Sequence, residues 1–225
     1  MQRYIIIVAG GQGLRINAQL PKQFLPIGGR PILMRTIERF YDFDATMPII
    51  IVLPQKHIDT WKTLCHKYGF DIKHDIVAGG EERFFSVRNA LSKIPDGVVV
   101  GIHDGVRPFA NNNTIAKAFA QAEMDGCAIP ALPVKESVRI ADGNTSTTLD
   151  RNNIMIVQTP QCFRSEIIKT AYNTPYKPLF TDDATVVETV LKKHICITPG
   201  NAENIKITTP LDLELAEFLL ERYSK

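Results

Sequence analysis

The chain has few of the residues on which disulfide scaffolds and zinc sites are built. Among its 225 residues there are only four cysteines, and none belongs to a C-x-x-C pair. The five histidines show no metal-ligand spacing either. This pattern argues against a secreted disulfide framework and against a structural zinc site. The cysteines are expected to be small buried hydrophobic residues, at Cys65, Cys127, Cys162 and Cys196.

Charge of one sign and long apolar runs are also scarce. The 26 lysines and arginines are nearly balanced by 24 aspartates and glutamates, so no global attraction to nucleic acid or to an anionic membrane is expected. The N-terminal apolar run stops at glycines after about five residues, too few for a signal peptide or a membrane span. We expect a cytoplasmic protein that binds neither nucleic acid nor membranes.

A phosphate-binding pattern lies near the N-terminus. Residues 5–8 are uniformly apolar, which is typical of a central parallel strand covered on both faces. The glycine-rich segment 9–15 follows directly, at the end of the strand where ligands of such sheets bind. Its glycines let the backbone approach an anion, and Arg15 and Lys22 supply positive charge. The pattern predicts a site for a nucleoside triphosphate.

Two better-known phosphate-binding motifs do not fit this segment. A dinucleotide fingerprint would need a third glycine where Ile16 stands, and the strand expected at 49–54 lacks the acidic residue that holds a ribose hydroxyl. A Walker loop would need Gly-Lys-Ser/Thr, whereas Lys22 lies between Pro21 and Gln23. The alternative that remains is a glycine turn with incidental basic residues.

Short β-rich runs alternate with amphipathic helical segments along the rest of the chain. This alternation predicts an α/β fold of one domain over residues 1–225, with a mostly parallel twisted sheet flanked by helices. Strands are expected at 4–9, 48–53, 72–77, 98–103, 127–132, 154–158 and 194–198, and helical spacing occurs at 33–41, 87–94 and 115–122.

The last helix is predicted to begin near Pro210, a favourable first-turn residue after Thr209. It is expected to close the fold with one buried face. The residues assigned to that face are Leu211, Leu215, Phe218 and Leu219.

One segment, at about 133–153, interrupts the alternation. Residues 133–140 alternate with period two, and Asp142-Gly143-Asn144 forms a turn signal before a second extended run. The pattern predicts a β-hairpin arm. Two strands rich in polar residues are marginally stable alone. The arm is therefore either a solvated excursion or an element that packs on a second subunit.

Polar clusters follow several predicted strands. His103-Asp104-Gly105-Val106-Arg107-Pro108 comes at the end of one, and a carboxylate there can hold Mg²⁺ against nucleotide phosphates. The alternative is that Asp104 caps a turn and Arg107 lies in solvent. Asp182-Asp183 precedes a helical run, so helix capping explains both acids. Lys206 interrupts an apolar alternation of strand type, and such a lysine needs an anion or another partner nearby.

Taken in order, these clusters closely resemble the 2-C-methyl-D-erythritol 4-phosphate cytidylyltransferase family of isoprenoid biosynthesis. The resemblance spans nearly the whole chain, and its ordered set of motifs is more specific than any single motif. The matching segments are Ala9–Arg15, Pro21–Gln23, Gly79–Arg83, His103–Pro108, Asp150–Arg151, Thr159–Gln161, Thr181–Asp183 and Asn204–Lys206.

The resemblance implies a Rossmann-like nucleotidyltransferase fold and a role for each matching residue. Arg15, Lys22 and Lys206 would act on the phosphates, and Asp104 would bind Mg²⁺ or another divalent cation. The Gly80-Glu81 backbone and the Ser86 hydroxyl would bind cytosine. The residues expected to bind CTP are Val8, Ala9, Gly10, Gly11, Gly13, Gly80, Glu81, Ser86 and Asp104.

The acceptor implied by the resemblance is a branched polyol phosphate, bound partly by a second subunit through the arm of a homodimer. The family usually shows Asp-Thr in the arm where this chain has Glu136-Ser137, which keeps a hydroxyl, removes a methyl group and lengthens the acid. The residues expected to bind the acceptor are Asp104, Arg107, Ser137, Arg151, Thr159, Thr181 and Lys206.

The predicted reaction is in-line attack of the acceptor's phosphate oxygen on the α-phosphorus of CTP, which releases pyrophosphate. The attacking phosphate is already anionic, so no protein nucleophile is required, and the protein aligns anions and stabilises the leaving group. Two alternatives remain: a ribitol 5-phosphate cytidylyltransferase, which shares most of these motifs, and a non-catalytic nucleotide sensor.

Overall fold

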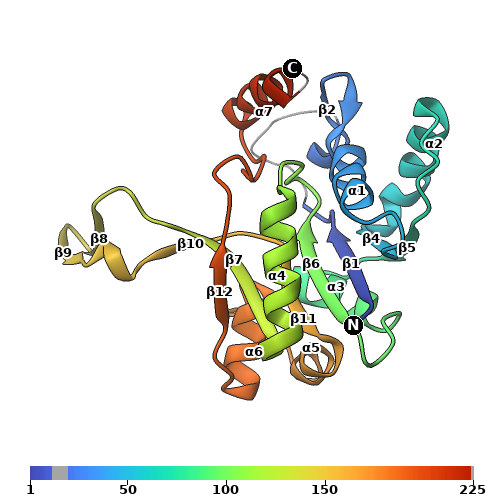
Figure 1. Cartoon of the computed structure of the whole chain (residues 1–225). Helices are drawn as coiled ribbons and strands as arrows, with labels where there is room; N and C mark the ends of the chain where they lie inside the picture. The colour runs from blue at the N-terminus through green and yellow to red at the C-terminus, as the bar shows by residue number, and fades with distance from the viewer. Residues whose placement is uncertain (12–19, 224–225) are drawn as a thin grey trace.

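A central sheet dominates the computed structural model, which describes residues 1–11 and 20–223 (Figure 1). Its strands are β1 Arg3–Val8, β4 Ile49–Leu53, β5 Asp75–Ala78, β6 Val99–Asp104, β7 Cys127–Pro133, β10 Met155–Val157, β11 Gln161–Arg164 and β12 Cys196–Pro199. Their order is β10–β7–β11–β6–β1–β4–β5, and β12 also pairs with β7. β10 and β11 run antiparallel to their neighbours, and the other pairs are parallel. The predicted mostly parallel sheet is confirmed.

Helices cover both faces of this sheet (Figure 1). One face carries α1 Ile32–Phe43, α2 Ile58–Tyr68 and α4 Asn112–Asp125, and the other carries α3 Arg83–Leu91, α5 Ser165–Tyr172 and α6 Asp183–Leu191. Successive strand residues point to opposite faces of the sheet. Ile5 and Ile7 therefore belong to the core beneath α1, α2 and α4, and Ile6 belongs to the core beneath α3, α5 and α6. Each such buried side chain contributes about 1.5–3 kcal/mol. Two-sided burial therefore explains the uniformly apolar run.

The strands predicted from the sequence are all present, with ends shifted by a few residues, but β11 of the central sheet and two short strands within residues 26–31 were not predicted. β11 lies between β6 and β7, and only two of its residues, Cys162 and Phe163, are apolar. A run this short carries no periodic signal. The segment Thr159-Pro160-Gln161 was interpreted as part of a polar binding site. The structure shows that its last residue, Gln161, is the first residue of β11.

The last helix, α7 Pro210–Tyr223, begins where predicted but packs through a different face. Leu211 and Phe218 are 71% and 53% exposed, and Leu215 is exposed too, whereas Ala216 and Leu219 are buried. The prediction was wrong for the three exposed residues. Apolar side chains lie around much of this helix, so periodicity alone does not select the packed face.

The packed face of α7 is the face that contacts a small β-hairpin. Its strands, β2 Pro26–Ile27 and β3 Arg30–Pro31, join at Gly28 and Gly29, whose φ angles of 55° and 73° favour glycine. Ile27 belongs to the same core cluster as the buried residues of α7. The Glu217 carboxylate of α7 accepts a hydrogen bond from the Gly28 N–H at 2.8 Å. The hairpin and α7 therefore form a third, smaller layer of the fold.

The predicted arm is present as a two-stranded hairpin that extends from the sheet (Figure 1). Its strands are β8 Val138–Asp142 and β9 Thr145–Leu149, and their side chains are mostly exposed. Gly143 turns the chain with a φ of 56°. Arg139 donates across the hairpin to Ser146 Oγ at 2.7 Å and to Thr148 Oγ1 at 2.8 Å. Within its own chain, the arm buries little apolar surface.

The cysteines are free thiols, of which Cys127 and Cys162 are buried and Cys65 and Cys196 are half-buried. The expectation of burial therefore holds fully for only two of them. Within residues 1–11 and 20–223, none of the helices is both long enough and apolar enough to cross a membrane.

The hydrogen bond between Trp61 of α2 and His74 is expected to make the stability of the fold depend on pH. Trp61 is fully buried, and its Nε1–H donates to His74 Nε2 at 3.0 Å while His74 Nδ1 lies 2.7 Å from the Ile72 carbonyl oxygen. Burial lowers the pKa of His74 below its usual 6.5. Because the folded pKa is lowered, this neutral histidine stabilises the fold above pH 6.5, and that contribution is lost as the pH falls toward the folded pKa. Thermal melts followed by Trp61 fluorescence are therefore expected to show a falling melting temperature below pH 6.5.

His74→Gln is the matched control, because glutamine offers an acceptor and a donor but does not titrate. Its melting temperature should fall less steeply than that of the unaltered protein over the same pH range. Parallel pH profiles of the two proteins would contradict the assignment to His74.

Candidate active site

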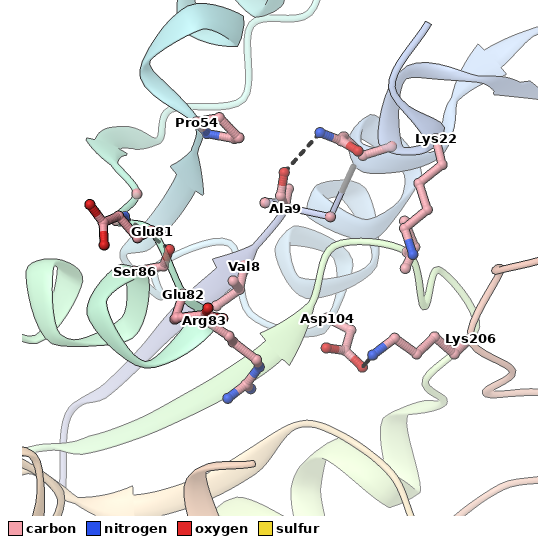
Figure 2. Close-up of a pocket in the computed structure, with 16 residues that line it drawn as sticks. Val8, Ala9, Lys22, Pro54, Glu81, Glu82, Arg83, Ser86, Asp104 and Lys206 are labelled. Atoms are coloured by element: carbon pink, nitrogen blue, oxygen red, sulfur yellow. Dashed lines mark hydrogen bonds and ion pairs between the residues drawn. The ribbon is translucent and has the colours of Figure 1, made fainter. Parts of the chain in front are cut away.

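A cavity of about 290 Å³ opens beyond the carboxyl ends of β6, β1, β4 and β5 (Figure 2). These strands are neighbours and parallel, and the end of such strands is where ligands of parallel sheets bind. The structure brings ten of the predicted site residues together around this cavity. They are Val8, Ala9, Gly10, Gly11, Lys22, Gly80, Glu81, Ser86, Asp104 and Lys206. The predicted Gly13 and Arg15 lie outside the described residues.

One end of the cavity is built on β1 and on the 3₁₀ turn Lys22–Phe24, where we predicted that the phosphates bind. The Gln23 side chain, which is buried, donates from Nε2 to the Ala9 carbonyl at 2.8 Å and so ties the turn to the end of β1. A Cβ atom on Gly11 would lie 3.0 Å from Lys22 Cε, so the lysine side chain passes close to the glycine backbone. Phe24 stacks on Trp61 with ring centroids 6.0 Å apart. Lys22 is therefore mounted on a turn that is anchored in the core.

The opposite end of the cavity is a turn between β5 and α3. The Gly79 N–H donates to the Leu53 carbonyl at 2.8 Å, and the Gly80 N–H donates to Ser86 Oγ at 3.1 Å. A Cβ atom on Gly80 would lie 2.4 Å from Phe85 Cβ, so only glycine fits there. The Ser86 hydroxyl can still donate its own proton. This turn presents backbone groups and one hydroxyl, as expected for a surface that binds a base.

Asp104 carries the negative charge between the two ends. Its Oδ2 lies 3.2 Å from Lys206 Nζ and accepts from Arg107 Nε at 3.0 Å. Burial alone would raise the pKa of Asp104, but Lys206, Arg83 and Arg107 hold it well below its usual value. Asp104 is thus the partner that we predicted for Lys206, and it is an anion. The segment Ile205–Ile207 is irregular, however, rather than the strand that the apolar alternation indicated.

A buried hydrogen-bond network fixes Asp104 from behind. Thr159 Oγ1 accepts from the Asp104 N–H at 3.1 Å and lies 2.9 Å from His103 Nδ1, while His103 Nε2 lies 2.9 Å from the Arg107 carbonyl oxygen. Burial lowers the pKa of His103 to about 4, so the ring is neutral at pH 7. Arg107 Nη1 also donates to the Asn204 carbonyl at 2.7 Å. Of the two residues predicted to bind the acceptor, Thr159 therefore holds the Asp104 backbone and Arg107 holds the Asp104 carboxylate.

The similarity to known proteins agrees with this geometry. A sequence model of the 2-C-methyl-D-erythritol 4-phosphate cytidylyltransferase family matches residues 4–222. The chain belongs to this family. Proteins with that name from Phocaeicola vulgatus and Bacteroides fragilis are 50% and 51% identical to it, over 98% of this chain and 100% of each relative. The crystal structure of 4-diphosphocytidyl-2C-methyl-D-erythritol synthase from Anaerococcus prevotii matches with a TM-score of 0.83 at 28% identity, covering 98% of this chain and 96% of that chain.

Membership of the cytidylyltransferase family confirms the resemblance drawn from the ordered motifs, and it disfavours a non-catalytic sensor. The cavity suits the family's chemistry, because its lining combines the basic residues Lys22, Arg83 and Lys206 with the buried carboxylate of Asp104 and a glycine-rich backbone, while Glu81 and Glu82 also line it. Within residues 1–11 and 20–223, no cluster of three or more His, Cys, Asp or Glu side chains is arranged to hold a metal. A metal ion at this site would therefore need ligands from the substrates as well, and Asp104 is the residue that we predicted to bind it.

Besides Arg107 and Thr159, three predicted acceptor residues do not line the cavity. Ser137 and Arg151 belong to the exposed arm, and Arg151 Nη1 donates to the Lys135 carbonyl at 2.6 Å. Thr181 is exposed just before the N-terminus of α6. The arm that carries Ser137 and Arg151 extends away from the central sheet (Figure 1), and neither residue lines the cavity of its own chain.

Sequence reasoning did not assign several cavity residues. Asp182 caps α6 as predicted, accepting from the Thr185 N–H at 2.8 Å, but Asp183 is buried and forms an ion pair with Arg83. Its interpretation as a helix-dipole acid alone was wrong. Arg83 was part of a matching motif, yet its partner lies a hundred residues further on, so no local signal linked them. The unassigned lining residues are Gln23, Pro54, Gly79, Glu82, Arg83 and Val106.

Proposed function

We propose that this chain transfers CMP from CTP to 2-C-methyl-D-erythritol 4-phosphate, which yields 4-diphosphocytidyl-2-C-methyl-D-erythritol and pyrophosphate. The observation that carries the proposal is the cavity itself: a glycine turn with the Ser86 hydroxyl at one end, Lys22 at the other, and the Asp104–Lys206 pair between them. Such a site can hold a base, a triphosphate and an acceptor phosphate side by side.

In the proposed reaction, an oxygen of the acceptor phosphate forms a bond to the α-phosphorus while the bond from that phosphorus to the α,β-bridging oxygen breaks. The bridging oxygen leaves with pyrophosphate. Lys22 and Lys206 offset the repulsion between the anions and stabilise the charge that develops on the leaving group. Arg15, which the family resemblance assigns to the same task, would add a third cation.

A divalent cation, Mg²⁺ by preference, is part of the proposal. Mg²⁺ keeps most of its waters and takes one or two carboxylates together with substrate phosphates. Asp104 fits this need, because it is ionised and, among the described residues, its hydrogen bonds and closest ion-pair contacts are at Oδ2 rather than Oδ1. Asp104 would hold the ion, which would withdraw charge from the phosphate oxygens. The four free cysteines suit a reducing compartment, and we propose the cytoplasm.

The proposal is tested by pyrophosphate release from CTP with two acceptors in parallel. Methylerythritol 4-phosphate is expected to be used at least about tenfold more efficiently than ribitol 5-phosphate, a difference of about 1.4 kcal/mol. UTP and ATP serve as controls for the base. A preference for ribitol 5-phosphate, or equal turnover with UTP or ATP, would overturn the assignment.

A homodimer formed through the arm completes the proposal. The arm has little buried surface of its own, and Arg151 lies in the 3₁₀ turn that follows β9, where its guanidinium would bind the acceptor phosphate of a neighbouring subunit. Each active site would then combine the cavity of one chain with arm residues of the other.

Mixing Arg151→Ala and Lys22→Ala proteins is expected to restore activity. In a mixed dimer one site carries both defects and the other carries neither, and random exchange makes about half of the dimers mixed. Activity should therefore approach about a quarter of that of the unaltered protein. The measurement is pyrophosphate release after subunit exchange, which is verified with two affinity tags.

A mixture of Lys22→Ala with Lys206→Ala is the matched control, since both residues line the cavity of one chain. Every site in those mixed dimers keeps one defect, so activity should stay low. If confirmed Arg151/Lys22 heterodimers also stay inactive, Arg151 acts within its own subunit and the shared site is wrong.

A further inference from the structure

A buried carboxylate holds an arginine at the wall of the cavity. Asp183 is fully buried at the start of α6, and it accepts from Arg83 Nη1 at 2.9 Å and from Arg83 Nη2 at 2.5 Å. The hydroxyl of Tyr172, which is also buried, donates to the same carboxylate at 2.6 Å. The arginine is thus bound through both ends of its fork, the geometry that fixes a guanidinium most firmly.

The two partners of this ion pair differ in exposure. The Asp183 side chain is 0% exposed, whereas the Arg83 side chain is 29% exposed and lines the cavity beside Asp104 (Figure 2). Within the described residues, both hydrogen bonds of the guanidinium go to Asp183. A guanidinium carries five N–H donors, so several remain for an acceptor on the cavity side.

The carboxylate cannot easily turn away, because its neighbours are fixed as well. Asp182 Oδ2 accepts from Gln161 Nε2 at 2.8 Å, and Gln161 Oε1 accepts from the Ala184 N–H at 2.9 Å. These two bonds attach the first turn of α6 to β11 on both sides of Asp183. The carboxylate that binds the Arg83 guanidinium is therefore held in place at the wall of the cavity.

An isolated ion pair of this kind is a poor source of stability, because removing the charges from water offsets their attraction. A preset cation is, however, a strong source of binding for a phosphate that enters the cavity. Burial alone would lower the pKa of Arg83, but Asp183 raises it above its usual value. The guanidinium stays charged at any pH at which the protein is folded.

We propose that Arg83 binds a phosphate oxygen of the substrates, on either the α-phosphate of CTP or the acceptor phosphate, and that Asp183 and Tyr172 are positioning residues for it. The inference deepens the proposed function and rests on it. It adds a cation to the reaction centre on the wall opposite Lys22.

The decisive experiment is the double variant Arg83→Met/Asp183→Asn. Arg83→Met alone leaves a buried carboxylate without its partner, so that protein is expected to be strongly destabilised. The double variant removes both charges, and the amide that replaces the carboxylate keeps an acceptor for Tyr172. We expect its melting temperature to return to near that of the unaltered protein, while kcat/KM stays lower by about 10²-fold, because a preorganised donor to the reacting phosphate is missing.

A purely structural ion pair makes the opposite prediction. Activity would then recover together with stability, and a double variant with turnover within about threefold of the unaltered enzyme would overturn the proposal. If the double variant does not fold, Arg83→Lys decides, because lysine keeps an ion pair with Asp183 but lacks the fork. We expect Arg83→Lys to fold and to lose at least about tenfold in kcat/KM, and unchanged turnover would again overturn the proposal.

Two binding measurements distinguish the phosphates. Contact with the α-phosphate predicts that the double variant binds CTP at least about tenfold more weakly in calorimetry, while its affinity for cytidine is unchanged. Contact with the acceptor phosphate predicts unchanged CTP affinity and a KM for the acceptor raised by at least about tenfold. If neither value changes, the proposal is wrong. The calorimetry needs no turnover, so a failure of the proposed function, seen as an inactive unaltered enzyme, is recognised separately.

Discussion

Replacing Lys22 by alanine is expected to lower turnover with CTP by about 10²–10³-fold, the usual loss when one preorganised charge-stabilising donor is removed. The lysine sits on a turn anchored by Gln23 and Phe24, and it lines the cavity at the end where we propose that the triphosphate binds. The alanine variant keeps that anchor. Its melting temperature should change little, and kcat should fall more than the affinity for CTP.

Lys117→Ala is the control for a general loss of positive charge, since Lys117 lies on α4 and does not line the cavity. Its steady-state kinetics should match those of the unaltered enzyme. Two results would remove Lys22 from the mechanism: turnover close to normal, or an early melt that accounts for the lost activity.

The sequence predicted β1 and the helices α1, α3 and α4, but it did not predict the amphipathic helices α2 and α5. β1 is apolar on both faces because helices cover both, and its glycine-rich exit leads straight into the cavity. β11 was not predicted because its two apolar residues, Cys162 and Phe163, are too few to show a periodic pattern. For α7 the start was right and the packed face wrong, because the β2–β3 hairpin, a tertiary partner, selects the face.

The site residues also fall into two groups, those that local motifs predicted and those whose roles depend on contacts between distant parts of the chain. Residues in contiguous motifs, such as Gly80 and Ser86, meet around the cavity because the carboxyl ends of neighbouring parallel strands share one edge. The role of Arg83 could not be derived, since it depends on Asp183, which is distant in sequence and whose capping position offered a sufficient local explanation. Thr159 was predicted as a substrate contact, and its geometry adds a bond to the Asp104 N–H that no motif expresses.

Replacing Asp104 by asparagine is expected to lower turnover by about 10²–10³-fold while the shape of the side chain is kept. The carboxylate lies within 3.2 Å of Lys206 Nζ and accepts from Arg107 at 3.0 Å, so its loss releases both cations and removes the proposed metal ligand. Asp104 has a lowered pKa in the folded state. It therefore stabilises the fold above the usual carboxyl pKa of 3.8, and the variant should melt earlier at pH 7, by a margin that shrinks as the pH falls below 3.8.

The role of Asp104 toward a metal ion is separated from its role toward the cations by a magnesium titration. If Asp104 holds the ion, Asp104→Asn should need a Mg²⁺ concentration at least about tenfold higher for half-maximal turnover. Glu82→Gln is the matched control, because Glu82 is exposed, lines the same cavity and makes no side-chain cap. Its Mg²⁺ requirement should be unchanged. An Asp104→Asn enzyme that is slow but has a normal Mg²⁺ requirement would assign Asp104 to fixing Lys206 and Arg107 alone, and the metal-ligand role would be wrong.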